Sequence, residues 1–200
     1  FYGIEEEKIE VIYSGVNQPQ IDETRIPEIR KKYNLPENYI LYLGAIEPRK
    51  NILGIVKAFG IFKKEQPQNL KLVIAGRSGW LNKPIFNYIN NSEFRKDILL
   101  TGFIDEQDKP YIYKMSKVFV YPSFFEGFGF QVLEAASAGT PVVTSNTSSL
   151  PEIIGSSCLM VDPYNPKEIS RGIGHILKNE NLSGILSESG KLKASKFIWE

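Results

Sequence analysis

Short, almost continuously apolar runs recur along this chain, and helical patterns lie between them. Each run is four to six residues long and rich in Ile, Leu and Val, as is typical of strands buried on both faces of a parallel sheet. Residues 52–62 and 169–177 carry apolar side chains at the i, i+3, i+4, i+7 spacing of an amphipathic helix, and 105–114 predicts a shorter helix. The apolar runs cover residues 8–13, 39–43, 70–75, 98–101, 118–121, 141–144 and 158–161.

Strand followed by helix, repeated about six times, predicts an α/β fold. The expected architecture is a doubly wound parallel sheet of about six strands, Rossmann-like, with helices on both faces. We expect one domain over residues 1–200, entered through a polar loop at residues 17–28. In such sheets the ligand lies at the carboxyl ends of the strands. The residues that directly follow each run are therefore the candidates for a functional site.

Composition argues against several classes of function. Lys and Arg number 24 and Asp and Glu number 23, so the net charge of +1 gives no reason to expect a nucleic-acid partner. Cys158 is the one cysteine and His175 the one histidine, which excludes an intrachain disulfide and argues against a metal site. We interpret Cys158 as a buried hydrophobic residue and His175 as a packing or surface residue. No run reaches the roughly 18 apolar residues of a membrane-spanning helix, and we expect a cytoplasmic protein.

Two cations follow the run at residues 39–43. Gly44 opens the loop, and Arg49 and Lys50 stand directly before the predicted helix at 52–62. A glycine permits close approach of a ligand, and the free N–H groups of a helix start favour an anion. The segment fits either a phosphate site or a solvated loop with two ordinary cations. It lacks the G-x-x-x-x-G-K-[ST] pattern of a nucleotide-hydrolysing loop.

The next two strand ends carry weaker signals. Gly76 begins the sequence GRSGW, in which two glycines permit close approach of a backbone or ligand. Phe103 and Ile104 lie just after the run at 98–101. Backbone groups at this turn would pair with the edge of a base while Phe103 packs beside it. A plain hydrophobic turn fits these residues equally well.

The segment after the run at 118–121 is the most informative. Glu126 lies in a loop with Gly127 and Gly129, and Glu134 lies about one turn into a helix that begins near residue 131. The freed backbone N–H groups would hold a diphosphate, with a carboxylate on each side to accept hydrogen bonds from sugar or ribose hydroxyls. This arrangement suits a nucleotide sugar. The alternatives are a hydrolase with paired carboxylates and a simple capping loop, for which the apolar residues between the glycines would be poor choices.

Glu126 to Glu134 resembles the E-x7-E motif of retaining glycosyltransferases with two Rossmann-like domains, the GT-B enzymes called glycosyltransferases group 1. The resemblance extends over nearly the whole chain. Residues 8–17 are similar to the stretch that leads into the second domain, and Gly44 with residues 48–51 to the phosphate-binding loop. Residues 138–143 and 149–152 are similar to the following strand and helix start. Residues 197–200 resemble the opening of the last helix, which crosses back to the first domain. The resemblance implies that residues 1–200 are the C-terminal, nucleotide-sugar-binding domain and that the N-terminal acceptor domain is absent from this chain.

The resemblance also implies a role for each candidate residue. Arg49 and Lys50 would hold the diphosphate of the donor, and Glu134 would bind the ribose hydroxyls. Glu126 and the backbone after it would hold the donor sugar, and the turn at Phe103 would contact the base. Neither a metal nor a prosthetic group is implied, and no catalytic residue is expected in this chain because the active-site histidine belongs to the first domain. The implied donor-binding residues are Gly44, Arg49, Lys50, Gly76, Phe103, Ile104, Glu126, Gly127, Phe128, Gly129, Phe130 and Glu134.

Three departures from the family bear on these roles. Ala45 stands where the family often has an arginine, so the division of work between Arg49 and Lys50 stays open. Gln131 replaces a frequent proline at the helix start, which loosens that start without removing a ligand. The sequence GRSGW at 76–80 is similar to the mannosyltransferase-like branch, which favours GDP-mannose over a UDP-sugar as donor.

We therefore expect the full-length protein to transfer a hexose from a nucleotide donor to a sugar or lipid-linked acceptor, with retention, in glycan or polysaccharide biosynthesis. The expected partners are the nucleotide sugar, the N-terminal domain and, through an acceptor lipid, the cytoplasmic face of a membrane. We expect this chain alone to bind donor without transferring sugar. A dinucleotide-dependent oxidoreductase and a non-catalytic nucleotide-binding module remain alternatives, and the lack of G-x-G-x-x-G argues against the first.

Overall fold

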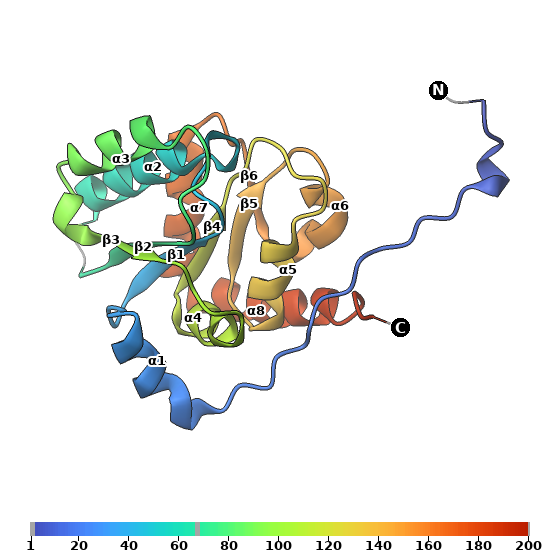
Figure 1. Cartoon of the computed structure of the whole chain (residues 1–200), viewed down its shortest axis with the longest axis horizontal. Helices are drawn as coiled ribbons and strands as arrows, with labels where there is room; N and C mark the ends of the chain where they lie inside the picture. Colours follow the sequence, from blue (N-terminus) through green and yellow to red (C-terminus); the bar gives the residue numbers. More distant parts are fainter. Residues whose placement is uncertain (1–2, 67–68, 200) are drawn as a thin grey trace.

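Parallel strands form one six-stranded sheet in the computed structural model, which describes residues 3–66 and 69–199. Every residue of the first, fourth and fifth strands is buried, because helices cover both faces of the sheet (Figure 1). The doubly wound fold is confirmed, and each strand begins and ends within one residue of the run that predicts it. The strands are β1 (Tyr39–Leu43), β2 (Lys71–Ala75), β3 (Ile98–Gly102), β4 (Val118–Tyr121), β5 (Val142–Ser145) and β6 (Leu159–Val161).

Helices connect the strands and form a layer on each face of the sheet. The α-helices are α1 (Ile26–Lys32), α2 (Ile52–Glu65), α3 (Lys83–Asn90), α4 (Lys109–Met115), α5 (Phe130–Ser137), α6 (Leu150–Ile154), α7 (Pro166–Lys178) and α8 (Glu180–Ala194). Helices α2, α3 and α7 pack together in one layer, and α4, α5 and α8 form the other, with α1 against α4 (Figure 1). Short 3₁₀ helices lie at Glu6–Lys8, Glu23–Arg25, Pro48–Lys50, Arg95–Asp97, Glu106–Asp108 and Gly155–Ser157.

Asparagine side chains start the longest helices. The side-chain oxygen of Asn51 accepts a hydrogen bond from the amide of Gly54 at 3.1 Å. Asn165 and Asn179 cap α7 and α8 in the same way. Each cap satisfies an N–H group that has no partner within its own helix. Asn51 thereby fixes the point at which the loop after β1 turns into α2.

The strand order places two loops at one crevice. The order is β3-β2-β1-β4-β5-β6, so the direction of connection reverses between β1 and β4. In open α/β sheets a ligand binds at the carboxyl ends of the two strands where this reversal occurs. The loops after β1 and β4 carry Arg49, Lys50 and Glu126. The fold therefore brings the predicted cations and the first predicted carboxylate to the same place.

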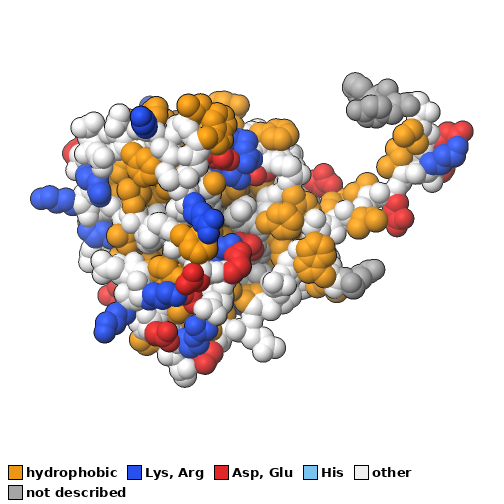
Figure 2. Space-filling view, in the orientation of Figure 1, with side chains coloured by type: hydrophobic (Ala, Val, Ile, Leu, Met, Phe, Trp, Pro, Cys, Tyr) orange, Lys and Arg blue, Asp and Glu red, His pale blue; other side chains and the backbone are white. Residues whose placement is uncertain are grey.

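The predicted strand at residues 8–13 is wrong. Lys8 ends the 3₁₀ helix Glu6–Lys8, and residues 9–13 lie in extended coil that leads away from the globular body and pairs with none of the described strands (Figures 1 and 2). Ile9, Val11 and Ile12 are 58%, 67% and 86% exposed. The run is apolar without being buried, because neither edge of the sheet reaches it. An apolar pattern alone does not show whether the chain holds a neighbouring strand with which the run can pair.

Two further predictions near the chain ends need correction. The segment 17–28, predicted as a loop, contains the 3₁₀ helix Glu23–Arg25 and the start of α1. Residues 197–199, which resemble a helix opening, lie in coil after α8, and Glu200 is outside the described residues. The carbonyl of Phe197 accepts a hydrogen bond from the amide of Val16 at 2.8 Å, so the two ends of the chain run side by side here.

Cys158 and His175 lie as the sequence predicts. Cys158 is 8% exposed, and burial raises the pKa of its thiol to about 12. His175 is exposed on α7. None of the helices in the described part of the chain has the length and apolar character needed to cross a bilayer.

Candidate functional site

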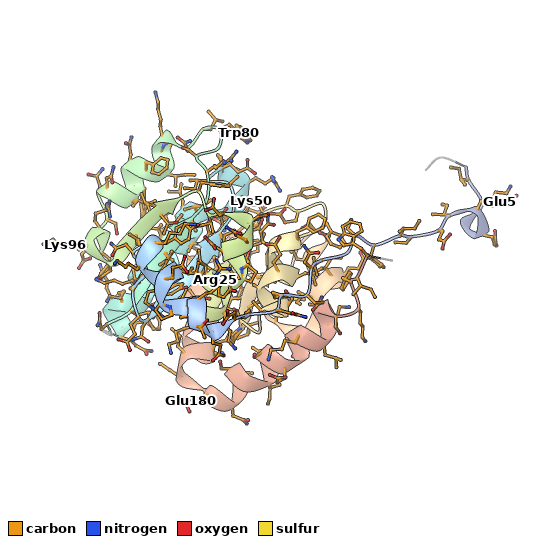
Figure 3. All side chains as sticks on the ribbon, turned by 60° about the horizontal axis from the view of Figure 1, so that its bottom comes forward. Glu5, Arg25, Lys50, Trp80, Lys96 and Glu180 are labelled. Atoms are coloured by element: carbon orange, nitrogen blue, oxygen red, sulfur yellow. The ribbon has the colours of Figure 1, made fainter. Side chains whose placement is uncertain are left out.

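Four charged side chains meet where the loops after β1 and β4 converge. We call Glu47, Arg49, Lys50 and Glu126 the charged cluster. Arg49 and Lys50 lie in the 3₁₀ helix Pro48–Lys50, and Glu126 lies in the β4–α5 loop, residues 122–129. Lys50 points into the body of the molecule near the middle of the view in Figure 3. The structure thus brings three of the predicted site residues into direct contact.

Glu126 bridges both cations. Its Oε1 accepts a hydrogen bond from Lys50 Nζ at 2.7 Å, and its Oε2 accepts one from Arg49 at 3.0 Å. Glu47 accepts from the second terminal nitrogen of Arg49 at 2.8 Å. The side chains of Lys50 and Glu126 are each 7% exposed, whereas that of Arg49 is 40% exposed. The charges of the cluster are therefore balanced, and Arg49 is the cation that reaches solvent.

The cluster keeps Glu126 ionised. Burial acts to raise the pKa of Glu126, but hydrogen bonds from Lys50 and Ser123 and the charges of Lys50 and Arg49 hold the pKa below its usual value. Burial acts against the charge of Arg49, yet Glu126 and Glu47 raise its pKa. A hydrolase with paired carboxylates needs a general acid with a raised pKa. Glu126 does not fit that role.

Two buried tyrosines complete the site, and the sequence analysis missed both. The hydroxyl of Tyr121, at the end of β4, accepts from Lys50 Nζ at 2.5 Å and donates to Gln131 at 3.1 Å. Tyr42 stacks on Tyr121 with ring centroids 5.9 Å apart and donates to the carbonyl of Ala45 at 2.7 Å. Burial raises the pKa of both phenols, so they stay neutral. A signal was present, because a tyrosine at the end of a buried strand needs a polar partner there.

Serines from the loop after β5 hold the β4–α5 loop in place. Ser148 Oγ accepts from the amide of Glu126 at 3.0 Å. Ser149 Oγ donates to the carbonyls of Glu126 and Phe128, each at 3.0 Å. Ser148 has a φ of 57°, a left-handed conformation that is uncommon for a residue other than glycine. These contacts fix the backbone on both sides of Gly127.

The same loop presents amide groups at the start of α5. Gly129 has a φ of 104°, and a Cβ there would lie 2.6 Å from a methyl carbon of Leu150, so only glycine fits. Within the described part of the chain, the amides of Gly127, Phe128, Gly129 and Phe130 donate no hydrogen bond. Phe128 packs on Phe130 with ring centroids 4.8 Å apart. Unpaired amides at a helix start favour an anion.

Glu134 lies on α5 beyond these amides and lines a groove of about 500 Å³. Its Oε2 accepts a hydrogen bond from the hydroxyl of Tyr113 at 2.9 Å. Burial and the nearby Glu134 raise the pKa of Tyr113. The two predicted carboxylates therefore lie in different surroundings on either side of the start of α5. The groove is lined by Asn17, Glu106, Lys109, Tyr113, Phe130, Glu134 and Trp199, among others.

Gly44 and Gly76 join the loops after β1 and β2. The amide of Gly44 donates to the carbonyl of Ala75 at 2.9 Å, and that of Gly76 donates to the carbonyl of Gly102 at 2.7 Å. Gly76 has a φ of 133°, and a Cβ there would lie 1.9 Å from the carbonyl oxygen of Gly44. The two glycines thus allow the loops to cross. Their amides already donate hydrogen bonds within the protein.

Phe103 and Ile104 follow β3 and differ in exposure. Phe103 is 52% exposed, and the guanidinium carbon of Arg77 lies 4.2 Å from its ring centroid. Ile104 is 2% exposed, so its side chain belongs to the core. At this turn Phe103 offers a side chain to a ligand, and Ile104 offers only its backbone.

Comparisons with known proteins agree with the fold. The family described as glycosyl transferases group 1 matches residues 25–193. The O-antigen chain mannosyltransferase B of Escherichia coli is 37% identical over 173 residues, which are 86% of this chain and 45% of that protein. The structure of Anabaena Alr3699/HepE in complex with UDP and glucose has a TM-score of 0.85 and 18% identity, and it covers 98% of this chain and 54% of that one.

A second solved structure matches this chain over nearly the whole length of both proteins. The C-terminal domain of the glycosyl transferase group 1 family protein LpcC from Francisella tularensis has a TM-score of 0.72 and 20% identity, and it covers 92% of this chain and 94% of that one. At this level of identity both structural likenesses show the fold. The present chain spans less than half the length of the E. coli relative.

Proposed function

This chain belongs to the glycosyl transferases group 1 family, and on that premise we propose that it binds a nucleoside-diphosphate sugar between the loops after β1 and β4. The observation that carries the proposal is the meeting of Arg49, Lys50 and Glu126 beside four unpaired amides at the start of α5. Cations and N–H donors suit the diphosphate in the middle of such a ligand. Carboxylates on either side suit the hydroxyls of its two sugars.

The two cations would act differently on the diphosphate. Arg49 is 40% exposed and keeps N–H groups beyond those bound to Glu47, Glu126 and the carbonyl of Phe125, so we assign it direct contact with phosphate oxygens. Lys50 is buried and bound to Glu126 and Tyr121. Its positive charge would therefore act on the diphosphate from the protein interior, without direct contact. As the bond to the donor sugar breaks, both charges stabilise the leaving diphosphate.

The ends of the donor would lie on opposite sides of α5. Glu134 would accept hydrogen bonds from the ribose hydroxyls, because it borders the groove and keeps one carboxylate oxygen beyond its bond to Tyr113. The base would enter the groove, whose wall includes Glu106 in the 3₁₀ helix that follows the turn at Phe103. Glu126 would hold the donor hexose through its remaining lone pairs.

A mannosyl donor is the proposed substrate class. The E. coli relative is named as an O-antigen chain mannosyltransferase, and GRSGW at 76–80 favours the same branch. We therefore propose GDP-mannose as the donor, with a UDP-sugar as the second choice because HepE is seen with UDP. The name of the E. coli relative also supports glycan or polysaccharide biosynthesis as the setting. We propose a sugar or lipid-linked acceptor at the cytoplasmic face of a membrane.

The whole protein's reaction is part of the same proposal. We propose transfer of the hexose with retention at the anomeric carbon, carried out only when acceptor and donor are held together and water is excluded. The chain spans 45% of its E. coli relative, which supports a role as the donor-binding part of a longer enzyme. This chain alone would then bind donor without sustained transfer.

Calorimetry on single variants tests the proposal. Arg49→Ala should weaken binding of GDP by roughly 10- to 100-fold and leave guanosine binding unchanged, because a charge-assisted hydrogen bond is worth about 1.5–3 kcal/mol. Glu134→Gln should weaken binding of GDP and guanosine alike, since both carry the ribose. UDP and uridine are measured in the same way if GDP does not bind.

Arg171→Ala is the matched control. Arg171 lies exposed on α7, so its loss removes one positive charge away from the site. It should leave every affinity within about twofold, since isolated surface charges contribute little. Equal weakening of diphosphate and nucleoside by Arg49→Ala would show that Arg49 does not touch the phosphates. Equal weakening of GDP binding by Arg171→Ala would show that the loss follows from the change in net charge and not from a contact at the site.

A further inference from the structure

Trp80 is a large side chain that is exposed and yet held in place. It is 61% exposed and stands at the rim of the molecule in Figure 3, on the loop between β2 and α3. Its indole Nε1 donates a hydrogen bond to Glu47 Oε2 at 3.1 Å. Glu47 in turn binds Arg49, which links the indole to the charged cluster. The hydrogen bond fixes one edge of the ring and leaves the rest of the indole open to solvent.

The loop under Trp80 is tied to the loop after β1. The amide of Ile46 donates to the carbonyl of Arg77 at 3.0 Å, and the amide of Gly79 donates back to the carbonyl of Ile46 at 3.1 Å. The Asn82 side chain donates to Ser78 Oγ at 2.7 Å. These bonds hold the loop on both sides of Trp80. An ordered, exposed indole offers contact area without the entropy cost of ordering it on binding.

Saccharides match this pair of groups. A hexopyranose has a face of C–H groups, which packs on an indole, and a rim of hydroxyls, which donate to a carboxylate. Glu47 is 13% exposed, and each of its oxygens accepts one hydrogen bond from the protein and keeps a free lone pair. We propose that Trp80 and Glu47 form a stacking platform for a hexopyranose ring of the acceptor saccharide. The inference rests on the proposed function, which supplies a donor for the transfer.

The position of the platform assigns it to the acceptor. The groove beside Glu134 is lined from the N-terminal segment, the α4 and α5 layer and the C-terminal coil, and the loops after β1 and β2 contribute nothing to its described lining. Trp80 precedes α3, which packs with α2 in the other layer. Glu126, which we assign to the donor hexose, is linked to the platform through Arg49, which binds Glu47. A ring stacked on Trp80 would therefore lie across Arg49 from both the nucleotide and the carboxylate assigned to the donor hexose.

Saccharide binding by variants of this chain tests the platform. Ligand-observed NMR would titrate mannobiose, the probe suggested by the mannosyltransferase relative, against the wild-type chain, Trp80→Ala, Trp80→Tyr and Tyr88→Ala. We expect millimolar binding to the wild-type chain, at least tenfold weaker binding to Trp80→Ala, and partial retention in Trp80→Tyr, which keeps an aromatic face. Tyr88→Ala is the matched control, because Tyr88 is 41% exposed on the neighbouring helix α3. It should bind as the wild-type chain does.

Nucleotide titrations on the same variants separate this inference from the proposed function. GDP and GDP-mannose should bind Trp80→Ala as they bind the wild-type chain. Absence of mannobiose binding to the wild-type chain, or equal binding to Trp80→Ala and Tyr88→Ala, would overturn the platform. Weaker binding of GDP-mannose but not of GDP to Trp80→Ala would assign the platform to the donor hexose and overturn the acceptor assignment. Failure of the wild-type chain to bind any nucleoside diphosphate would instead overturn the proposed function.

Discussion

Replacing Lys50 with methionine removes one half of the buried ion pair and leaves the carboxylate of Glu126 behind. The two side chains are each 7% exposed, and their charged atoms lie 2.7 Å apart. Removing one partner of such a pair destabilises a fold by about 3–5 kcal/mol, because the remaining charge is buried without compensation. Arg49 still contacts Glu126 at 3.0 Å. We therefore expect the lower end, a loss of about 3 kcal/mol of unfolding free energy at neutral pH.

The loss should depend on pH in a defined direction. In the wild-type chain the pKa of Glu126 lies below its usual value of 4.5, so the ionised carboxylate contributes stability that is lost as the pH falls through the lowered pKa. Without Lys50 the pKa of Glu126 rises, and its protonation relieves the buried charge. The stability difference between the wild-type chain and Lys50→Met should therefore shrink between pH 7 and pH 4, by about 1 kcal/mol for each unit by which the pKa rises.

Urea unfolding followed by circular dichroism at pH 7.0, 5.5 and 4.5 measures both effects. Lys64→Met is the matched control, because Lys64 pairs with Glu93 at the same 2.7 Å while both side chains are 64% exposed. That control should lose less than about 1 kcal/mol. The double variant Lys50→Met/Glu126→Gln should recover about 1–3 kcal/mol relative to Lys50→Met alone. Equal losses in the two single variants, or a loss that neither low pH nor Glu126→Gln relieves, would refute the reasoning.

Three further predictions concern the fold around the site. Gly129→Ala should lower the unfolding free energy by about 1–3 kcal/mol because of its positive φ and the clash with Leu150, whereas Gly184→Ala, on the open face of α8, should raise it by about 0.5–1 kcal/mol; equal shifts in urea midpoints would contradict this. Ser149→Ala should cost about 1 kcal/mol, since two loop carbonyls lose their donor, and an unchanged midpoint would show that the bonds contribute nothing. Burial raises the pKa of Cys158 to about 12, so a thiol reagent at pH 8 should label the folded chain at least about 100-fold more slowly than the urea-unfolded chain; rapid labelling of folded protein would show that the thiol is accessible.

The sheet could be predicted because its strands follow from local patterns, whereas the strand order and its switch point come from the structure. The strands from β1 to β6 are short apolar runs, and parallel strands separated by helices leave few arrangements open. Once β1 and β4 are neighbours, the residues after them must meet. The contact of Arg49 and Lys50 with Glu126 therefore follows from the strand order that the structure shows.

Other parts of the site depend on contacts between distant segments. Tyr121 binds Lys50 across 71 positions of the chain, and Ser149 binds the carbonyl of Glu126 across 23. No local periodicity reports such side-chain bonds. The prediction of a strand at 8–13 was wrong for a related reason. Its apolar residues have no strand to pair with in the described structure. Sequence reasoning thus located the strand ends and left their detailed geometry undetermined.

A calorimetric screen of the unmodified chain with GDP, UDP, ADP and NAD tests the central claim most directly. The account predicts that GDP or UDP binds at least about tenfold more tightly than NAD, a difference of about 1.4 kcal/mol, and that its affinity exceeds that of its nucleoside. The second comparison reports the contribution of the cations and amides to binding of the diphosphate. Tighter binding of NAD, or equal affinities for a nucleoside diphosphate and its nucleoside, would contradict a nucleotide-sugar site between the loops after β1 and β4.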